Sequence, residues 1–66
     1  MHGSEPMTPA KLLIAQRLSE SSEELKAIAT LSDEYRNDPR WALQTAEIRR
    51  ASEFARWWST EIRKEP

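Results

Sequence analysis

The fold is decided by one short stretch of the sequence, Tyr35-Arg36-Asn37-Asp38-Pro39-Arg40-Trp41. Asp38 can cap a helix whose first residue is Pro39, because proline has no N–H to leave unsatisfied in a first turn. Asn37 tolerates the left-handed backbone conformation that ends many helices. Helices joined by so few residues usually lie antiparallel. The stretch therefore predicts a turn between two antiparallel helices.

Residues on both sides of this turn recur in steps of three and four. In the first segment the row is Ile14, Leu18, Ser21, Leu25, Ile28, Ser32 and Tyr35. In the second segment the row is Trp41, Gln44, Ile48, Ala51, Ala55, Trp58 and Ile62. These steps are typical of packed helices and differ from the alternation of a strand. We expect an all-α, antiparallel two-helix hairpin with helices over roughly residues 9–36 and 39–64 that face each other along these rows.

The start and the middle of the first helix carry capping signals. Thr8, placed before another proline, can cap the helix in the same way as Asp38. Within the helix, Ser21 and Glu24 have the spacing of a capping box, so the chain either restarts there or continues with its serines facing a close neighbour. We favour a continuous helix, because Leu18 and Leu25 keep their spacing across this point.

The chain length limits how much apolar surface one copy can bury. Sixty-six residues form at most one domain, and a chain of this size buries only about 60% of the surface that its unfolded form exposes. We assign residues 8–66 to a helical hairpin domain and residues 1–7 to a disordered or leader segment. The chain has no cysteine, and its only histidine is His2. Disulfides and thiolate metal sites are therefore excluded, and oligomerisation remains as the way to complete the core.

No pattern in the sequence indicates catalysis or a bound cofactor. The chain offers no cysteine or internal histidine as nucleophile or base. The glutamates of the first helix lack the Glu-x-x-His pattern of a carboxylate metal bundle. No apolar run approaches the 18 residues of a membrane span. We expect a soluble, cytoplasmic, non-enzymatic protein with no cofactor, metal, small-molecule substrate or membrane contact.

Small residues form a row of their own on the first helix. Ala15, Ser22 and Ala29 follow one another at seven-residue spacing. Small side chains opposite bulky ones let a bundle fill its interior without voids. We expect this row to allow close packing of the helices.

The surplus of aromatic and leucine side chains is the main functional signal. We expect Trp41 and Trp58 on the seam and Leu43, Phe54 and Trp57 beside it. An aromatic side chain buries about 150–250 Å², so two helices alone cannot cover them all. The predicted oligomer or partner interface comprises Leu43, Phe54, Trp57, Trp58, Trp41, Leu13 and Leu31. We expect either a homodimer that forms a four-helix bundle or a regulator that docks on a larger protein. The alternative is that these side chains cover the ends of a single hairpin.

Charge supports the hairpin and offers an alternative function. Residues 1–38 hold four Lys/Arg and seven Asp/Glu, a balance of −3, whereas residues 39–66 hold six and four, a balance of +2. The two helices should therefore attract each other, although each exposed pair is worth only about 0–1 kcal/mol. The alternative function is a nucleic-acid-associated accessory protein, whose contacts would be Arg49, Arg50, Arg56 and Arg63.

The overall charge makes this alternative the less favoured one. The chain has a net charge of −1, whereas nucleic-acid-binding domains usually have a positive excess. We also expect Glu53 to pair along its own helix with Arg49 and Arg56. Nucleic acid is therefore not the expected partner.

Overall fold

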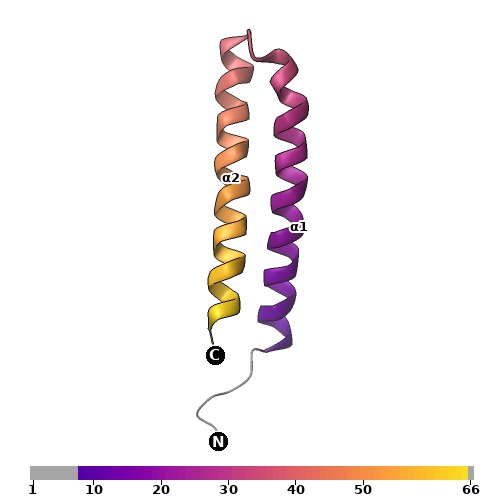
Figure 1. Ribbon diagram of the computed structural model, residues 1–66, viewed down its shortest axis with the longest axis vertical. Coiled ribbons are helices and arrows are strands. Elements are labelled where there is room, and N and C mark those ends of the chain that lie inside the picture. Colours follow the sequence, from indigo (N-terminus) through magenta and orange to yellow (C-terminus); the bar gives the residue numbers. More distant parts are fainter. Residues whose placement is uncertain (1–7, 66) are drawn as a thin grey trace, which may run out of the picture.

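The computed structural model describes residues 8–65, which form an all-α helical hairpin (Figure 1). Helix α1 spans Pro9–Ser32, a single 3-10 turn η1 spans Asp33–Tyr35, and helix α2 spans Pro39–Lys64. The two long helices run antiparallel side by side, so the start of α1 and the end of α2 lie at the same end, here called the open end. The predicted fold class is confirmed, and the bounds of the second helix agree with the prediction. The predicted leader segment, residues 1–7, lies outside the described residues.

Both predicted N-terminal caps are present. The Thr8 hydroxyl accepts a hydrogen bond from the Lys11 backbone N–H at 3.2 Å, and the Asp38 carboxylate accepts one from the Arg40 backbone N–H at 2.9 Å. These side chains satisfy donors that the first turn of a helix leaves without partners. Helix α1 is continuous past Ser21, as expected.

Helix α1 ends earlier than the expected residue 36. Its last turn tightens into η1, and the Asp33 and Tyr35 carbonyls then accept backbone hydrogen bonds from Arg36 at 3.2 Å and Asp38 at 3.0 Å. Tight turns of this kind satisfy the carbonyls that a helix C-terminus leaves free. The chain thereby reverses direction within a few residues and leads directly into α2.

The seam between the helices consists of small and mostly polar residues. The buried residues on α1 are Ala15, Ser22, Ala29 and Ser32. The buried residues on α2 are Thr45, Ser52, Ala55, Ser59 and Ile62. No large side chain is fully buried within the part of the chain that the structure describes. The expected close packing along Ala15, Ser22 and Ala29 is confirmed.

The predicted seam along the two rows of larger residues is wrong in most of its positions. Ile14, Ile28, Tyr35, Trp41 and Trp58 are all exposed, although they were expected to face the other helix. The physical reason is size: helix axes approach closely only where the side chains between them are small. The row of small residues therefore occupies the seam, one position along the chain from Ile14 and Ile28.

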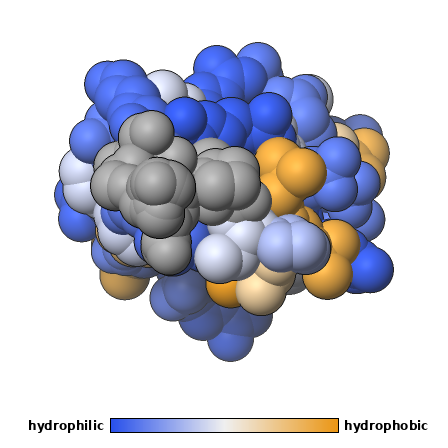
Figure 2. Space-filling view, turned by 90° about the horizontal axis from the view of Figure 1, so that it is seen from below, coloured by the Kyte–Doolittle hydropathy of each residue, from blue (hydrophilic) through white to orange (hydrophobic). Residues whose placement is uncertain are grey.

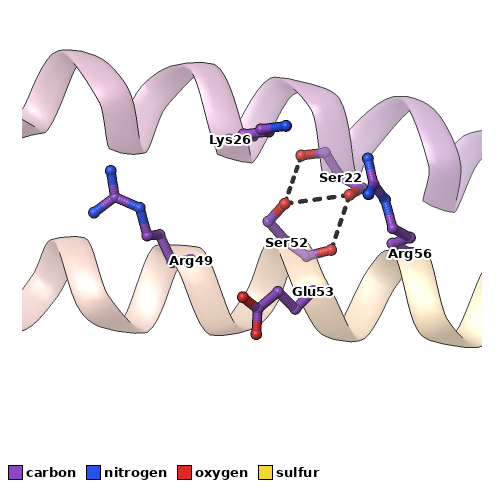
Figure 3. Close-up of a pocket in the computed structure, with 6 residues that line it drawn as sticks. All are labelled: Ser22, Lys26, Arg49, Ser52, Glu53 and Arg56. Carbon is purple, nitrogen blue, oxygen red and sulfur yellow. Dashed lines mark hydrogen bonds between the residues drawn. The ribbon is translucent and has the colours of Figure 1, made fainter.

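Serine hydroxyls bond the two helices directly at the middle of the seam (Figure 3). The Ser22 hydroxyl donates to the Ser52 carbonyl at 2.9 Å, and the Ser52 hydroxyl donates to the Ser22 carbonyl at 2.8 Å. The two Oγ atoms are 3.2 Å apart. Each hydroxyl has a single proton, and the carbonyl bonds use both. The pair is therefore reciprocal and fully satisfied, which removes the penalty of burying a polar group.

Two further hydroxyl contacts hold the ends of the seam. Toward the open end, the Ser59 hydroxyl donates to the Ala15 carbonyl at 2.7 Å. Toward the turn, the Thr45 hydroxyl donates to the Trp41 carbonyl at 2.8 Å, so Ser32 must supply the proton of its bond to Thr45. Every buried side-chain polar atom in the described range has a hydrogen-bond partner.

Candidate interaction surface

Helix geometry separates the surface of the hairpin into two sides. On each helix the small seam residues recur every seven positions, and a second row follows three positions later, with Leu18 and Leu25 on α1 and Ile48 on α2. Successive residues of a helix are rotated by about 100° around its axis. The residue just before each small seam residue therefore lies on the same side of the seam as the second row. The residue four positions after each small seam residue lies on the other side. The hairpin therefore has two long sides with different composition.

One side is apolar along both helices and is named here the open face. It comprises Ile14, Ile28, Tyr35, Trp41, Ala51 and Trp58, all of them exposed. These residues belong to the rows that were expected to form the seam. Ser32, Ala55 and Ile62 of the same rows are buried in the seam, so only the exposed members of the rows face away from the hairpin's own contact.

Aromatic rings cluster at both ends of the open face. Near the turn, the rings of Tyr35 and Trp41 lie with their centroids 4.7 Å apart. Toward the open end, Trp57 bridges Phe54 and Trp58, with centroid distances of 5.9 and 5.8 Å. Rings at these separations attract each other. The contacts hold the aromatic side chains together on the outside of the hairpin.

The opposite side is charged and is named here the charged side. The Arg49 guanidinium binds the Asp33 carboxylate through two bonds of 3.2 and 2.5 Å, and Arg56 binds Glu23 at 3.1 Å. The expected pairing of Arg49 and Arg56 with Glu53 along α2 is absent, because Arg49 reaches across to η1 and Arg56 reaches across to α1 instead. The predicted charge attraction between the helices is thus carried by these bridges.

The Arg49–Asp33 bridge changes the acidity of its carboxyl group. The hydrogen bonds from Arg49, helped by the positive charges of Arg49 and Arg36, lower the pKa of Asp33 below its ordinary value. The same contact raises the pKa of Arg49. Both side chains are well over a third exposed, so water screens the bridge and limits its effect.

A shallow groove runs along the charged side above the serine pair (Figure 3). It has a volume of about 210 Å³ and is lined by Ser22, Lys26, Arg49, Ser52, Glu53 and Arg56. Both serine hydroxyls already donate to carbonyls, and the two arginines already bind carboxylates. The other two charged lining residues, Lys26 and Glu53, form no ion pair within residues 8–65, so the uncommitted charges of the groove are one ammonium and one carboxylate.

The exposed fractions of three predicted interface residues indicate whether a single hairpin covers its own apolar surface. Leu43 and Phe54 are each 60% exposed, and Trp57 is 54% exposed. Leu13 and Leu31 are 50% and 71% exposed. Trp41 and Trp58 are 40% and 38% exposed. Both residues were predicted to lie on the seam and also to belong to the interface, and their exposure is compatible with the interface but not with the seam. These exposures do not favour the alternative, in which the same side chains cover the ends of a single hairpin.

Sequence reasoning missed part of this surface. Ile14, Ile28, Tyr35 and Ala51 were not among the predicted interface residues because they were expected between the helices. A usable signal was present: Thr45, Ser52 and Ser59 repeat the seven-residue spacing of the small row on the first helix. Two matching rows of small residues indicate the line of closest approach, and that line displaces the larger rows to the outside.

Figure 2 views the molecule from one end. Hydrophilic side chains cover the upper margin, and hydrophobic ones are seen at the right and along the lower margin, with hydrophilic ones between them. The open face also has a shallow hollow of about 240 Å³ lined by Arg40, Trp41 and Gln44.

Two other kinds of site are absent from residues 8–65. Within that range no helix is long and apolar enough to cross a membrane. The same residues contain no cluster of three or more histidine, cysteine, aspartate or glutamate side chains that could hold a metal ion. Comparison with protein-family models, curated proteins and solved structures returned no match. The class defined by fold and surface is thus an all-α hairpin with an exposed apolar side.

Proposed function

We propose that this protein is a small, non-enzymatic protein–protein interaction or oligomerisation module that works in the cytoplasm. A single observation carries the proposal: the small residues lie between the helices and the large apolar ones lie outside. Among the described residues, eleven large apolar or aromatic side chains are 38% or more exposed. Monomeric proteins rarely expose contiguous apolar patches larger than a few hundred Å². The exposed set fits a chain whose core is completed by another protein surface.

The energetic scale supports association. Burial of apolar surface contributes roughly 25 cal/mol per Å². Tryptophan is also among the residues that dominate binding free energy when they fill a pocket on a partner. Phe54, Trp57 and Trp58 form one contiguous aromatic cluster on α2, so they can enter a partner surface as a unit.

The ion pairs do not favour the nucleic-acid alternative. Arg49 and Arg56 are engaged by carboxylates of η1 and α1, and the Arg50 guanidinium lies 3.7 Å from the Glu47 carboxylate. To bind phosphate, these arginines would have to give up the carboxylates that they already contact. The proposal therefore concerns protein contact.

Two substitutions test the proposal. Phe54→Ala and Trp57→Ala should weaken self-association or partner binding, because each removes a large exposed apolar group, while helix content by circular dichroism stays within about a tenth of the wild type. Sedimentation velocity across a range of concentrations measures self-association. Binding to a larger protein is measured by photo-crosslinking from position 43 in cells, followed by mass spectrometry.

Thr60→Ala is the matched control, since Thr60 is exposed on the same helix outside the aromatic cluster. A wild-type chain that sediments as a single copy at about 1 mM, where even a weak complex of about −4 kcal/mol would be half formed, and that crosslinks to no protein would contradict the proposal.

A further inference from the structure

The open face has the geometry of a second helix–helix seam. Its residues and the half-buried second row, Leu18, Leu25 and Ile48, continue the steps of three and four along both helices. A helix that packs against two neighbours carries two such adjacent rows, as in four-helix bundles. Within the hairpin the row of small residues is covered, as are Ser32, Ala55 and Ile62 of the second row. Leu18, Leu25 and Ile48 are only half-buried, and the open-face residues beside them are exposed along both helices.

The shape of the open face suits a second helical hairpin. Ser21 and Ala51 lie at its middle, whereas Ile14 with Trp58 and Tyr35 with Trp41 lie toward its two ends. Packed helices cross at an angle, so their axes are closest at one point and separate on either side. Small residues at the middle permit the close approach, and bulky residues at the ends fill the widening gaps.

The area of the open face matches a stable interface. Its five large residues and the flanking Leu31 and Phe54 are each roughly two-fifths to seven-tenths exposed. An aromatic side chain alone buries about 150–250 Å², so these seven side chains together leave several hundred Å² exposed, on the order of the roughly 800 Å² that each partner buries in a standard-size complex.

The charges at its rim favour a copy of the same chain. Arg17 and Glu24 flank the face on α1, and Arg40 and Glu47 flank it on α2, all of them exposed. In a two-fold dimer the rim of one copy meets the rim of the other copy. Attraction between the two rims therefore requires both positive and negative charges on the same rim. A rim whose charges all had the same sign would instead suit a strongly acidic or strongly basic partner.

We infer that the open face binds the open face of a second copy of this chain, giving a four-helix bundle with its two-fold axis near Ser21 and Ala51. This inference rests on the proposed function and specifies its partner and its surface. The charged side, with Arg49 and Arg56, then lies on the outside of the dimer. Leu43 and Trp57, which lie farther round α2, remain available at its edge.

A pair of matched substitutions tests the surface. Ala51 and Ala46 are both exposed alanines in the middle of α2, but Ala46 lies away from the open face. Ala51→Glu should raise the dimer dissociation constant by at least roughly 100-fold, because it buries an unpaired charge in the interface. Ala46→Glu should leave that constant within about threefold of the wild type, since it stays in water. Sedimentation equilibrium measures the constants, and circular dichroism verifies that both variants remain helical.

A crosslinking experiment checks the position of the axis. The chain has no cysteine, so Ala51→Cys and Ala46→Cys each introduce a unique thiol. A short bismaleimide at low micromolar protein should convert the Ala51→Cys variant into a covalent dimer and leave the Ala46→Cys variant uncrosslinked.

The outcomes separate this inference from the proposed function. A wild-type chain that stays a single copy at high concentration overturns the inference, while docking on a larger protein is still tested by the crosslinks from position 43. A dimer that Ala51→Glu leaves intact but Phe54→Ala and Trp57→Ala dissociate also overturns it, and in that case the proposed function stands.

Discussion

Hydroxyl-bearing side chains form direct hydrogen bonds between the two helices of this protein. Ser22 and Ser52 exchange hydrogen bonds with each other's carbonyls, and Ser59 bonds to the Ala15 carbonyl. Serine is short enough to allow the close approach and polar enough to bond directly to the facing backbone. A serine at these positions therefore contributes through its size and through its hydroxyl.

Enlarging a seam residue should destabilise the hairpin even when the new side chain is apolar. Ser22→Leu should lower the free energy of unfolding by about 1–3 kcal/mol, because it overpacks the seam and removes the reciprocal bonds. Urea denaturation followed by circular dichroism measures the change. Ser19→Leu is the control, since Ser19 is exposed on the same helix and should shift stability by no more than about 0.5 kcal/mol. Equal stability of the two variants would refute the importance of small size at position 22.

At the scale of elements, local chemistry made the ends of the helices predictable. The caps at Thr8 and Asp38 and the bounds of α2 follow from residues that act within one turn of their own position. The seam was not predictable from spacing alone, because the row through Ile14 and the row through Ala15 have the same steps. Which row lies inside depends on side-chain size on both helices together, and that is a property of the pair.

The candidate surface was predictable only in part, for the same reason. The sequence alone predicts that Leu43, Phe54 and Trp57 are more apolar surface than two helices can cover, and all three are exposed. The open face is separated from the seam only when the two rows of small residues are compared across both helices, and the cross-helix bonds of Ser22 and Ser59 show directly which side of each helix faces the other.

The bridge from η1 to α2 should make the hairpin sensitive to acid. Asp33 has a lowered pKa in the folded chain, so its bridge to Arg49 stabilises the fold above the unfolded value of about 3.9. That contribution is lost as the pH falls through the lower, folded pKa. The difference in melting temperature between the wild type and Asp33→Asn should therefore shrink between about pH 6 and pH 2.

Thermal melts followed by circular dichroism at several pH values measure this difference. Glu34→Gln is the control, because Glu34 makes no ion pair within residues 8–65. A wild-type advantage over Asp33→Asn that is unchanged at pH 2 would contradict the assignment.

At the scale of the whole molecule, the distribution of residue sizes is inverted relative to an ordinary small domain. The buried residues are alanine, serine and threonine with Ile62, and the tryptophans are exposed. Such a chain gains little from its own interior. Under the proposed function, its stability should therefore depend on how much of its partner is present.

Melting temperature should consequently rise with protein concentration. A species that is stabilised by association gains stability by mass action, so raising the concentration 100-fold should raise the melting temperature by several degrees. Circular dichroism melts at about 2 and 200 μM, in cells of different path length, measure this shift. Ala51→Glu should show a smaller shift, and a wild-type melting temperature that is independent of concentration would show that the hairpin is stable alone.

The reciprocal serine pair has one more consequence, which concerns alignment along the helix axes. If α2 slid by one turn past α1, Ser22 would face the region of Ile48 or Arg56 instead of Ser52. The Ser22 hydroxyl would then lose its contact with the Ser52 hydroxyl, and a longer side chain would lie where the two helices approach most closely. The matched pair of serines therefore favours one alignment of the helices along their axes, and that alignment sets where the helix ends lie.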